Sequence, residues 1–310
     1  MRVAVVGAGG VGGYFGGRLA VAGEEVTFIA RGEHLQALRE DGLRVESVEG
    51  DFAVHPVAAT DRPVEVGPVE AVLVAVKSWQ LPEAAAAAKP LVGVETVVLP
   101  LLNGVEAATQ LSETMGREHV LGGLCRIIAE KVGPGHIRHA GAEPYVALGE
   151  LDNRRSERAE RLRSALASAG VRVEIPADIH VALWEKFLLI ASVSGVGAVT
   201  RAPVGVLRSL PETRDLITQA MREILAVARA RGVDLAAESV DRTLDFIDGL
   251  PPEGTASMQR DIVEGRPSEL EAQNGAVVRL GREAGVDTPV HAFLYSSLLP
   301  MERAARGEAE

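Results

Sequence analysis

Two different patterns of apolar positions divide the chain. In the first half, short β-branched runs lie at residues 2–7, 25–30, 71–76 and 96–102, each followed by a stretch able to form a helix. Continuous apolar runs of this length, alternating with helices, are typical of parallel strands that are buried on both faces. The pattern therefore predicts βαβ units that build a doubly wound parallel sheet.

The same half contains runs with a stricter apolar–polar alternation. Two of them, at 42–48 and 51–59, are separated by a Glu-Gly pair and predict a hairpin at the edge of the sheet. Strand-like pieces continue at 136–140 and 144–150. A charged segment at 153–170 then predicts a helix, and 171–175 predicts a last strand.

After Pro176 the pattern becomes helical throughout. We expect no strand there, and a domain boundary between residues 1–178 and residues 179–310. The final stretch, 302–310, is expected to be a frayed, solvated tail. Helical periodicity marks six segments: 179–199, 211–232, 235–248, about 256–264, 269–284 and 289–303.

Composition narrows the functional classes. Hydrophobic residues make up 47% of the chain and charged residues 24%, as in soluble globular proteins. A net charge of -11 without a basic block argues against nucleic-acid binding. Cys125 is the only cysteine, which favours a reducing, cytoplasmic location. The longest apolar run, 187–199, is shorter than the roughly 20 residues that span a bilayer, so we expect no membrane helix.

The first strand leads into a glycine-rich turn. Gly7, Gly9 and Gly12 have the spacing G-x-G-x-x-G, between a predicted strand and a predicted helix. In such turns the backbone approaches a pyrophosphate closely, and the helix N-terminus favours the anion. The turn predicts a Rossmann-type dinucleotide site, with these cofactor-binding residues: Gly7, Ala8, Gly9, Gly10, Val11 and Gly12.

Arg31, at the end of the second strand, bears on the choice of cofactor. NAD sites usually have an acidic residue at this place, which bonds the ribose 2′-hydroxyl. A guanidinium can instead pair with the 2′-phosphate of NADP, and a carboxylate would repel it. Arg31 therefore favours NADP. The alternative is a solvated arginine beside bound NAD.

Several motifs together resemble the ketopantoate reductases (2-dehydropantoate 2-reductases) over nearly the whole chain. In order they are GAGGVGG at 7–13, ARGEHLQALREDGL at 30–43, VAVKSWQ at 74–80, LLNGVE at 101–106, LWEKFLLIASVSGVGAVTRAP at 183–203 and SMQRDIVEGRPSELEAQNG at 257–275. The resemblance implies an NADPH-dependent reductase that reduces the C2 carbonyl of a 2-oxo acid, on the pathway through pantothenate to coenzyme A. It also implies a cleft between an NADP-binding domain and a helical substrate domain.

The resemblance also assigns roles to single residues. Lys186 corresponds to the proton donor, and Lys77 and Asn103 to residues around the nicotinamide ribose and the substrate. Ser257 corresponds to a serine that binds the substrate carboxylate. Two more positions are implied as cofactor contacts: Glu269, near substrate and cofactor, and Ile128, through its backbone.

Chemistry supports Lys186 independently of the resemblance. Hydride addition to a ketone leaves charge on oxygen, and an ammonium can both stabilise that charge and supply a proton. Its apolar neighbours at 183–195 make a purely solvated role costly unless the side chain snorkels out. The other residues have ordinary alternatives: Lys77 as a solvated strand end, Asn103 as a turn former, Ser257 as a helix cap and Glu269 as an exposed first-turn acid.

The chain departs from the family pattern at three positions. Ile190 and Ser194 lie four and eight residues beyond Lys186, nearly on its helical face, where the family has asparagines. Val204 stands where a further asparagine is usual. Ser194 is then the remaining polar candidate for substrate binding on this face. The substrate could therefore be ketopantoate or a less polar, branched 2-oxo acid.

Other functions remain as alternatives. A β-hydroxyacid or 3-hydroxyacyl-CoA dehydrogenase would need a histidine–glutamate pair, which we do not find. A noncatalytic NADP-binding sensor would bind a regulator instead of a substrate. His136 and His139 have no convincing third ligand, so we predict no metal site. The amphipathic segment 211–232 could form a homodimer interface.

Overall fold

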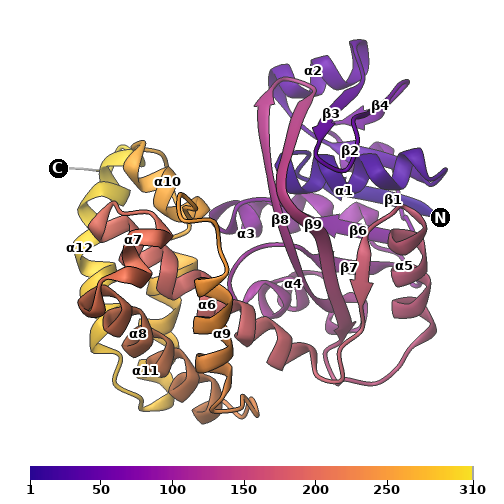
Figure 1. The fold of residues 1–310 in the computed structure, drawn as a ribbon. Helices are drawn as coiled ribbons and strands as arrows, with labels where there is room; N and C mark the ends of the chain where they lie inside the picture. The colour runs from indigo at the N-terminus through magenta and orange to yellow at the C-terminus, as the bar shows by residue number, and fades with distance from the viewer. Residues whose placement is uncertain (309–310) are drawn as a thin grey trace. The chain divides into compact units, whose positions relative to one another are not determined.

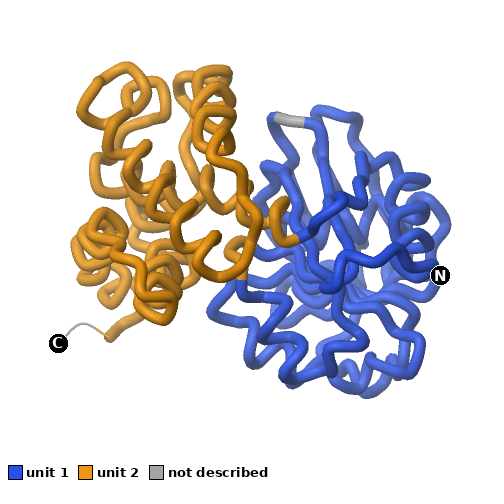
Figure 2. The backbone as a smooth tube through the Cα atoms, turned by 90° about the horizontal axis from the view of Figure 1, so that it is seen from below, with its two compact units in different colours: residues 1–102, 106–179 blue, residues 103–105, 180–310 orange. Residues whose placement is uncertain are grey.

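The computed structural model describes residues 1–308, except the side chain of Ala142. These residues form two compact units, drawn in different colours in Figure 2. Unit 1 comprises Met1–Leu102 and Glu106–Ile179, and unit 2 comprises Asn103–Val105 and His180–Glu310. The short segment Asn103–Val105 thus belongs to the second unit, although its neighbours on both sides belong to the first.

The first sheet of unit 1 is entirely parallel, with the strand order β5-β2-β1-β6-β7 (Figure 1). The order reverses beside β1, because the chain adds β2 and β5 on one side and β6 and β7 on the other. This is the predicted doubly wound arrangement, and the fold class is confirmed. The strands are β1 (Arg2–Val6), β2 (Glu25–Ile29), β5 (Ala58–Thr60), β6 (Ala71–Val74) and β7 (Val97–Pro100).

Both faces of this sheet are buried. Alternate residues of a strand point to opposite faces, so Val5 joins a core with Phe15, whereas Val6 joins a second core with Leu111. This double burial explains the continuous apolar runs in the sequence. The helices of unit 1 are α1 (Gly10–Val21), α2 (Gly32–Glu40), α3 (Leu81–Ala88), α4 (Ala107–Met115) and α5 (Glu157–Ser168), with short 3-10 turns at Pro63–Glu65, Ser78–Gln80, Lys89–Leu91 and Arg117–His119.

A second sheet corrects one prediction. The hairpin of β3 and β4 is antiparallel, as expected, but it pairs with β9 instead of extending the first sheet. The run predicted for its second strand is divided at Pro56, which lacks the N–H that a ladder requires. Its second half, β5, forms an edge of the first sheet. The strands of the second sheet are β3 (Leu43–Ser47), β4 (Phe52–Val54), β8 (Leu121–Gly133), β9 (His136–Glu150) and β10 (Arg172–Glu174).

β8 was not among the predicted strands. Its first part contains Gly122 and Gly123, which are unfavourable in isolated strands. Here they are required by packing: a Cβ at Gly123 would lie 2.4 Å from Leu99 Cδ1, and one at Gly122 would lie 2.6 Å from Ile179 Cγ1. Tertiary contacts therefore outweigh the local preference, and β8 and β9 form the long hairpin visible in Figure 1.

Unit 2 is helical, and none of its described residues forms a strand. It contains one helix that the pattern did not predict, α7, which starts after Pro203 and has six residues. The predicted helix at 269–284 begins with a π-helical turn, in which the Gly275 N–H bonds to the Leu270 carbonyl at 3.0 Å. The helices are α6 (Ile179–Thr200), α7 (Val204–Ser209), α8 (Pro211–Ala230), α9 (Ser239–Asp248), α10 (Ser257–Val263), the π turn η5 (Glu271–Gly275), α11 (Ala276–Ala284) and α12 (Pro289–Ala305).

Helix α6 matches the predicted segment 179–199 to within one residue. With 22 residues it is long and apolar enough to cross a membrane by length and composition alone, which the shorter run 187–199 did not indicate. However, 67% of its most apolar stretch is buried inside the protein. Phe187, Leu188 and Ala191 belong to the same core as Ile224 of α8. The burial indicates a central core helix, which is apolar on all sides for that reason.

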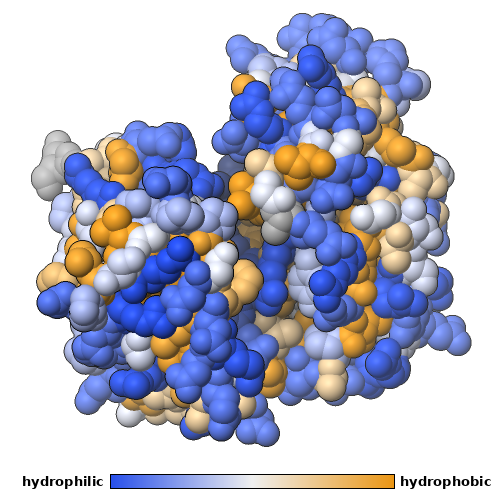
Figure 3. Space-filling view, in the orientation of Figure 1, coloured by the Kyte–Doolittle hydropathy of each residue, from blue (hydrophilic) through white to orange (hydrophobic). Residues whose placement is uncertain are grey.

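The C-terminal segment is structured further than expected. Glu302 is 5% exposed and accepts hydrogen bonds from the backbone N–H of Ser268. Arg306 donates to the same carboxylate at 2.7 Å. The predicted frayed tail is therefore wrong for these residues, since a buried carboxylate anchors them, and positions 309–310 lie outside the described residues. Elsewhere the surface in view is mainly hydrophilic (Figure 3).

Candidate active site

The glycine-rich turn of unit 1 is built as the spacing predicts. Gly7 follows β1 with φ of +95°, a conformation that favours glycine. A Cβ on Gly7 would lie 2.7 Å from the Ala75 carbonyl oxygen, and one on Gly12 would lie 2.0 Å from the Gly7 oxygen. The turn after β1 therefore packs directly on the turn after β6. This is the place where the strand order reverses, and where parallel sheets bind their ligands.

Gly9 differs from its neighbours in what surrounds it. A Cβ there would meet nothing within 4 Å, whereas one on Gly10 would lie 2.1 Å from the Ala129 carbonyl oxygen. Gly9 is also the N-cap of α1, and no side chain caps this helix. Open space beside a helix N-terminus fits a pyrophosphate. Ile128, 55% exposed, precedes Ala129 and so brings its backbone close to this turn.

His34 supports the turn, and the sequence reasoning missed it. Its Nδ1 accepts a hydrogen bond from the Gly135 N–H at 3.0 Å, so Nε2 carries the proton and donates to the Ala8 carbonyl at 2.7 Å. Burial lowers the pKa of His34 from its usual value, which keeps the ring neutral. His34 lies in the quoted motif ARGEH, which could have drawn attention to it. Its contact with Ala8 could not be predicted, because the two residues are distant in the sequence.

Arg31, which the sequence predicts to select the cofactor, already has a partner in the protein. It lies directly before α2, and its Nη1 donates to Glu83 Oε1 of α3 at 2.7 Å. Both side chains are exposed, 65% and 70% respectively. The guanidinium can leave this carboxylate for a phosphate at little cost, because exposed ion pairs are weak. Glu83 is a second residue that the sequence reasoning missed.

Lys77 starts the 3-10 turn after β6. Its backbone N–H donates to Gln80 Oε1 at 3.1 Å, and its Nζ lies 5.7 Å from the centre of the Trp79 ring. Gly7, Arg31 and Lys77 follow the carboxyl ends of three neighbouring strands, β1, β2 and β6. In a parallel sheet these ends share one edge. Within unit 1, the predicted cofactor residues therefore gather at one edge of the sheet.

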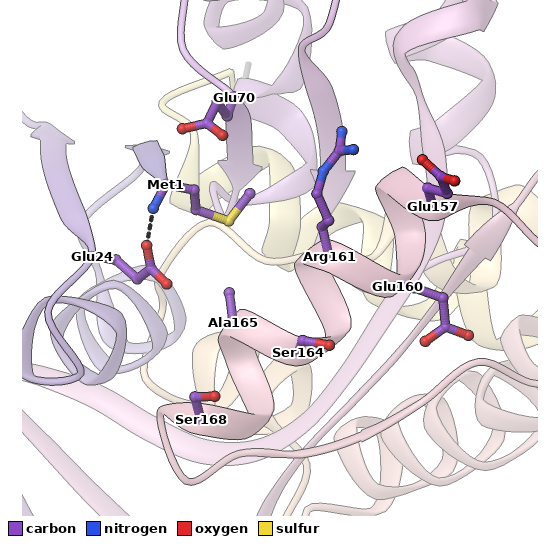
Figure 4. Close-up of a pocket in the computed structure, with 9 residues that line it drawn as sticks. All are labelled: Met1, Glu24, Glu70, Glu157, Glu160, Arg161, Ser164, Ala165 and Ser168. Atoms are coloured by element: carbon purple, nitrogen blue, oxygen red, sulfur yellow. Dashed lines mark hydrogen bonds and ion pairs between the residues drawn. The ribbon is translucent and has the colours of Figure 1, made fainter.

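A hollow of about 610 Å³ lies at the opposite ends of the same strands (Figure 4). Met1, Glu24 and Glu70 directly precede β1, β2 and β6, and the other lining residues come from α5. The amino group of Met1 pairs with Glu24. The hollow is acidic and lies at the amino ends of the strands, so it does not suit the phosphates of a dinucleotide.

Unit 2 brings together three predicted residues that are distant in sequence. The Lys186 ammonium donates to Asn103 Oδ1 at 3.0 Å, and Asn103 Nδ2 donates to Glu269 Oε2 at 2.8 Å. Lys186 is half-buried, while Glu269 is only 4% exposed. A lysine can only donate and a carboxylate can only accept, so the two partners fix which end of the amide faces each of them.

Local structure explains how Asn103 reaches the other two. Gly104 has φ of +96°, and its Cα packs so closely on η5 that a Cβ would lie 3.0 Å from the Ala272 carbonyl oxygen. Glu269 lies just before η5, and Lys186 lies in the second turn of α6. The Asn-Gly pair is therefore more than a turn former, because it holds an amide between the ammonium and the carboxylate.

The remaining predicted residues of unit 2 are placed separately. The burial of Glu269 excludes its alternative as an exposed first-turn acid. Ser257 is the first residue of α10, but the N-cap is Ala256, whose backbone N–H donates to Gln259 Oε1 at 3.3 Å, so Ser257 is no cap. Ser194 is 0% exposed and its Oγ has no partner among the described residues. Ile190, one turn from Lys186, is half-buried. No group of three potential metal ligands occurs within residues 1–308.

Two family descriptions match the chain. Residues 3–153 match "Ketopantoate reductase PanE/ApbA", and residues 178–302 match "Ketopantoate reductase PanE/ApbA C terminal". The 2-dehydropantoate 2-reductase of Archaeoglobus fulgidus is 32% identical over 302 residues, which cover 97% of this chain and 98% of that protein. An uncharacterized oxidoreductase of Bacillus subtilis is 30% identical over 298 residues, 96% of this chain and 98% of its own.

Solved structures show the same fold. The PanE/ApbA family ketopantoate reductase from Ralstonia eutropha has a TM-score of 0.90 and 34% identity, covering 99% of this chain and 100% of that one. A D-mandelate dehydrogenase with NADH and anilino(oxo)acetate has a TM-score of 0.91 at 24% identity, with 99% of each chain covered, and it shares the fold. The resemblance drawn from the motifs is thus confirmed: the chain belongs to the ketopantoate reductase PanE/ApbA family and is an oxidoreductase that acts on a CH–OH group.

Proposed function

We propose that the protein uses NADPH to reduce the C2 carbonyl of a 2-oxo acid, in the first place 2-dehydropantoate to pantoate. The observation that carries the proposal is the chain of hydrogen bonds from Lys186 through Asn103 to Glu269. Relatives at 30–32% identity are named 2-dehydropantoate 2-reductase, which supports the choice of substrate.

Lys186 is the proton donor in this proposal. As hydride reaches the carbonyl carbon, charge develops on the oxygen, and the ammonium stabilises it and then releases a proton to it. Asn103 orients the ammonium through its Oδ1, and Glu269 holds the amide in that orientation. The side chain is thus positioned before the substrate arrives, which reduces the reorganisation that the reaction requires. We assign the hydroxyl of Ser257 to the substrate carboxylate.

Unit 1 is assigned the cofactor. Bound NADPH would supply the hydride. The turn of residues 7–12 suits its pyrophosphate, Arg31 its 2′-phosphate, and Lys77, Asn103, Glu269 and the Ile128 backbone are assigned to the remainder. A protein with the same fold holds NADH, so the fold by itself does not select the phosphate. Selection is assigned to Arg31, which offers a bidentate donor.

The test is NADPH oxidation with a panel of 2-oxo acids, with NADH as the comparison. Lys186→Ala should abolish turnover and leave the Kd for NADPH unchanged, measured by cofactor fluorescence. Lys89→Ala is the matched control, because Lys89 is exposed on the 3-10 turn Lys89–Leu91. NADPH binding by the wild type without turnover of any 2-oxo acid would contradict the reductase and favour a noncatalytic sensor. A preference for NADH would remove the role of Arg31.

A second substrate is favoured by one observation, the apolar side chain at 190 on the face of Lys186. Without the two amides usual in this family, the pocket could take a less polar, branched 2-oxo acid such as 2-oxoisovalerate. Steady-state kinetics with ketopantoate and 2-oxoisovalerate separate the two. A preference for ketopantoate by several orders of magnitude contradicts the relaxed pocket.

The setting of the reaction follows from the same proposal. Reduction of 2-dehydropantoate belongs to the synthesis of pantothenate and coenzyme A, and we assign it to the cytoplasm. A homodimer remains a proposal without an assigned face, because the apolar side of α8, with Ile217, Met221 and Ile224, is buried in the core of its own unit and cannot form the interface expected from the sequence. Sedimentation of the wild type would test the dimer.

A further inference from the structure

Lys186, Asn103 and Glu269 together form the Lys186 cluster. Two buried side chains on the segments that form this cluster carry polar atoms without partners. Gln273 is 0% exposed, and neither its Oε1 nor its Nε2 has a hydrogen-bond partner among the described residues. The same holds for the Oγ of Ser194, also 0% exposed. Most buried polar groups in native proteins are paired, because an unpaired buried amide has lost its hydrogen bonds to water without replacing them. The side-chain amide of Gln273 and the hydroxyl of Ser194 therefore require an explanation.

Both residues belong to the segments that form the cluster. Gln273 lies in η5, one turn beyond Glu269, and its backbone N–H donates to the Glu269 carbonyl at 3.0 Å. Ser194 lies two turns beyond Lys186 on nearly the same face of α6. The two segments are in contact beyond Asn103 as well, because Asn274 Nδ2 donates to the Ala191 carbonyl at 3.2 Å. A Cβ on Gly195 would lie 2.6 Å from that same Nδ2.

The π turn itself is a second sign of function. In η5 the Gly275 N–H bonds to the Leu270 carbonyl, five residues back, so the turn holds one residue more than an α-helix would. Such single π turns often occur at functional sites. Here the extra residue belongs to the stretch that separates Glu269 from α11 and that contains Gln273.

We propose that the amide of Gln273, with the hydroxyl of Ser194, binds the polar end of the substrate, in place of the amides missing at Ile190 and Ser194. This inference rests on the proposed 2-oxo acid reductase and favours a hydroxyl-bearing substrate over an apolar one. An amide can accept from a hydroxyl through Oε1 and donate to it through Nε2. Its three side-chain torsions let it turn toward a ligand, and no existing hydrogen bond of the side chain is lost.

The experiment compares ketopantoate, which has a terminal hydroxyl, with 2-oxoisovalerate, which lacks it. Gln273→Met keeps the length of the side chain and removes the amide. We expect kcat/KM for ketopantoate to fall about tenfold or more, because a site that bonds a hydroxyl discriminates through that bond. The value for 2-oxoisovalerate and the Kd for NADPH should stay the same. Thermal stability should stay the same or rise, since a buried unpaired amide is removed.

Two serine variants give the internal control. Ser194→Ala should lower the ratio of the two kcat/KM values in the same direction, by about fivefold. Ser192 is equally buried and its Oγ is also unpartnered, but it lies on another face of α6. Ser192→Ala should therefore leave the ratio unchanged.

Other results overturn the inference. If Gln273→Met lowers both kcat/KM values equally, or lowers only the melting temperature, the amide has a structural role. If the wild type reduces 2-oxoisovalerate as well as ketopantoate, the proposed binding of the hydroxyl is wrong while the reductase stands. If the wild type binds NADPH and reduces neither these nor any other 2-oxo acid, the proposed function fails as well.

Discussion

The two groups of candidate residues are assembled in different ways. The glycine-rich turn of unit 1 is local. Gly7, Gly9 and Gly12 lie within six residues, and a strand and a helix fix their geometry. The cluster of unit 2 is non-local, since Asn103 lies 83 residues before Lys186 and 166 before Glu269. A local motif can be recognised in one sequence, while a non-local one depends on helix packing. The two should therefore respond differently to single substitutions.

The largest expected effect is on the non-local cluster. Asn103→Asp removes the Nδ2 donor and places a carboxylate against Glu269, so kcat should fall by about 10³-fold. Adding Glu269→Gln restores a donor opposite the new carboxylate, and part of the activity should return. Steady-state kinetics check both variants. If kcat of the double variant is no higher than that of Asn103→Asp, the arrangement of donors and acceptors between Lys186 and Glu269 does not control the activity.

Each unit contains a buried histidine that should make the stability of the protein depend on pH. His291 is completely buried, with Nδ1 accepting from Asn274 Nδ2 and Nε2 donating to the Ala220 carbonyl. Burial lowers the pKa of His291 from 6.5 to about 4. The unfolded state thus binds more protons between these values, so the neutral ring contributes stability above pH 6.5 that is lost as the pH falls toward 4. The loss in unfolding free energy amounts to about 3 kcal/mol.

Chemical denaturation of the wild type and His291→Gln between pH 4 and 7 would measure this contribution. The difference between the two proteins should shrink as the pH falls. Glu223, whose pKa is raised by burial, acts in the opposite direction and is present in both proteins, so it cancels. A difference that does not depend on pH would show that His291 titrates normally. His34 of unit 1, whose pKa is lowered for the same reason, should act with the same sign.

A pair of glycine variants tests the glycine-rich turn of unit 1. Gly9→Ala projects a methyl group into open space, so folding should be unaffected, but the Kd for NADPH should rise about tenfold to a hundredfold. Gly12→Ala meets the Gly7 carbonyl and should lower stability as well. Fluorescence titration and thermal denaturation separate the two outcomes. Unchanged NADPH binding by Gly9→Ala would place the pyrophosphate elsewhere.

The smallest effect concerns Glu83. Its carboxylate holds the Arg31 guanidinium and would repel a 2′-phosphate. Glu83→Gln should therefore tighten NADPH binding about two- to fivefold, leave NADH binding unchanged, and make NADPH binding more sensitive to salt, because the attraction of Arg31 for the phosphate is no longer offset. Glu65→Gln is the control, since Glu65 pairs with another exposed arginine, Arg62. An equal change in affinity for NADH and NADPH would show that Glu83 does not act on the 2′-phosphate.

The errors of the sequence interpretation have identifiable causes. Four strands of the first sheet were predicted correctly: β1, β2, β6 and β7. They are buried on both faces, so each is a continuous run of apolar residues in the sequence. β8 was missed because Gly122 and Gly123 serve close packing instead of strand propensity. The hairpin was recognised but assigned to the wrong sheet, since its partner β9 lies about 90 residues later. Pro56, which divides the second run, was the signal for the separate strand β5.

By itself the sequence determined the doubly wound sheet, the change to helices, the glycine-rich turn and the special place of Lys186. Those features depend on periodicity and on single residues in local contexts. Only the tertiary structure decided that Asn103 folds with the second unit, that Glu83 holds Arg31, and that Gln273 is buried without partners. These depend on which distant segments pack together, and packing is set by many weak contacts that no single motif records.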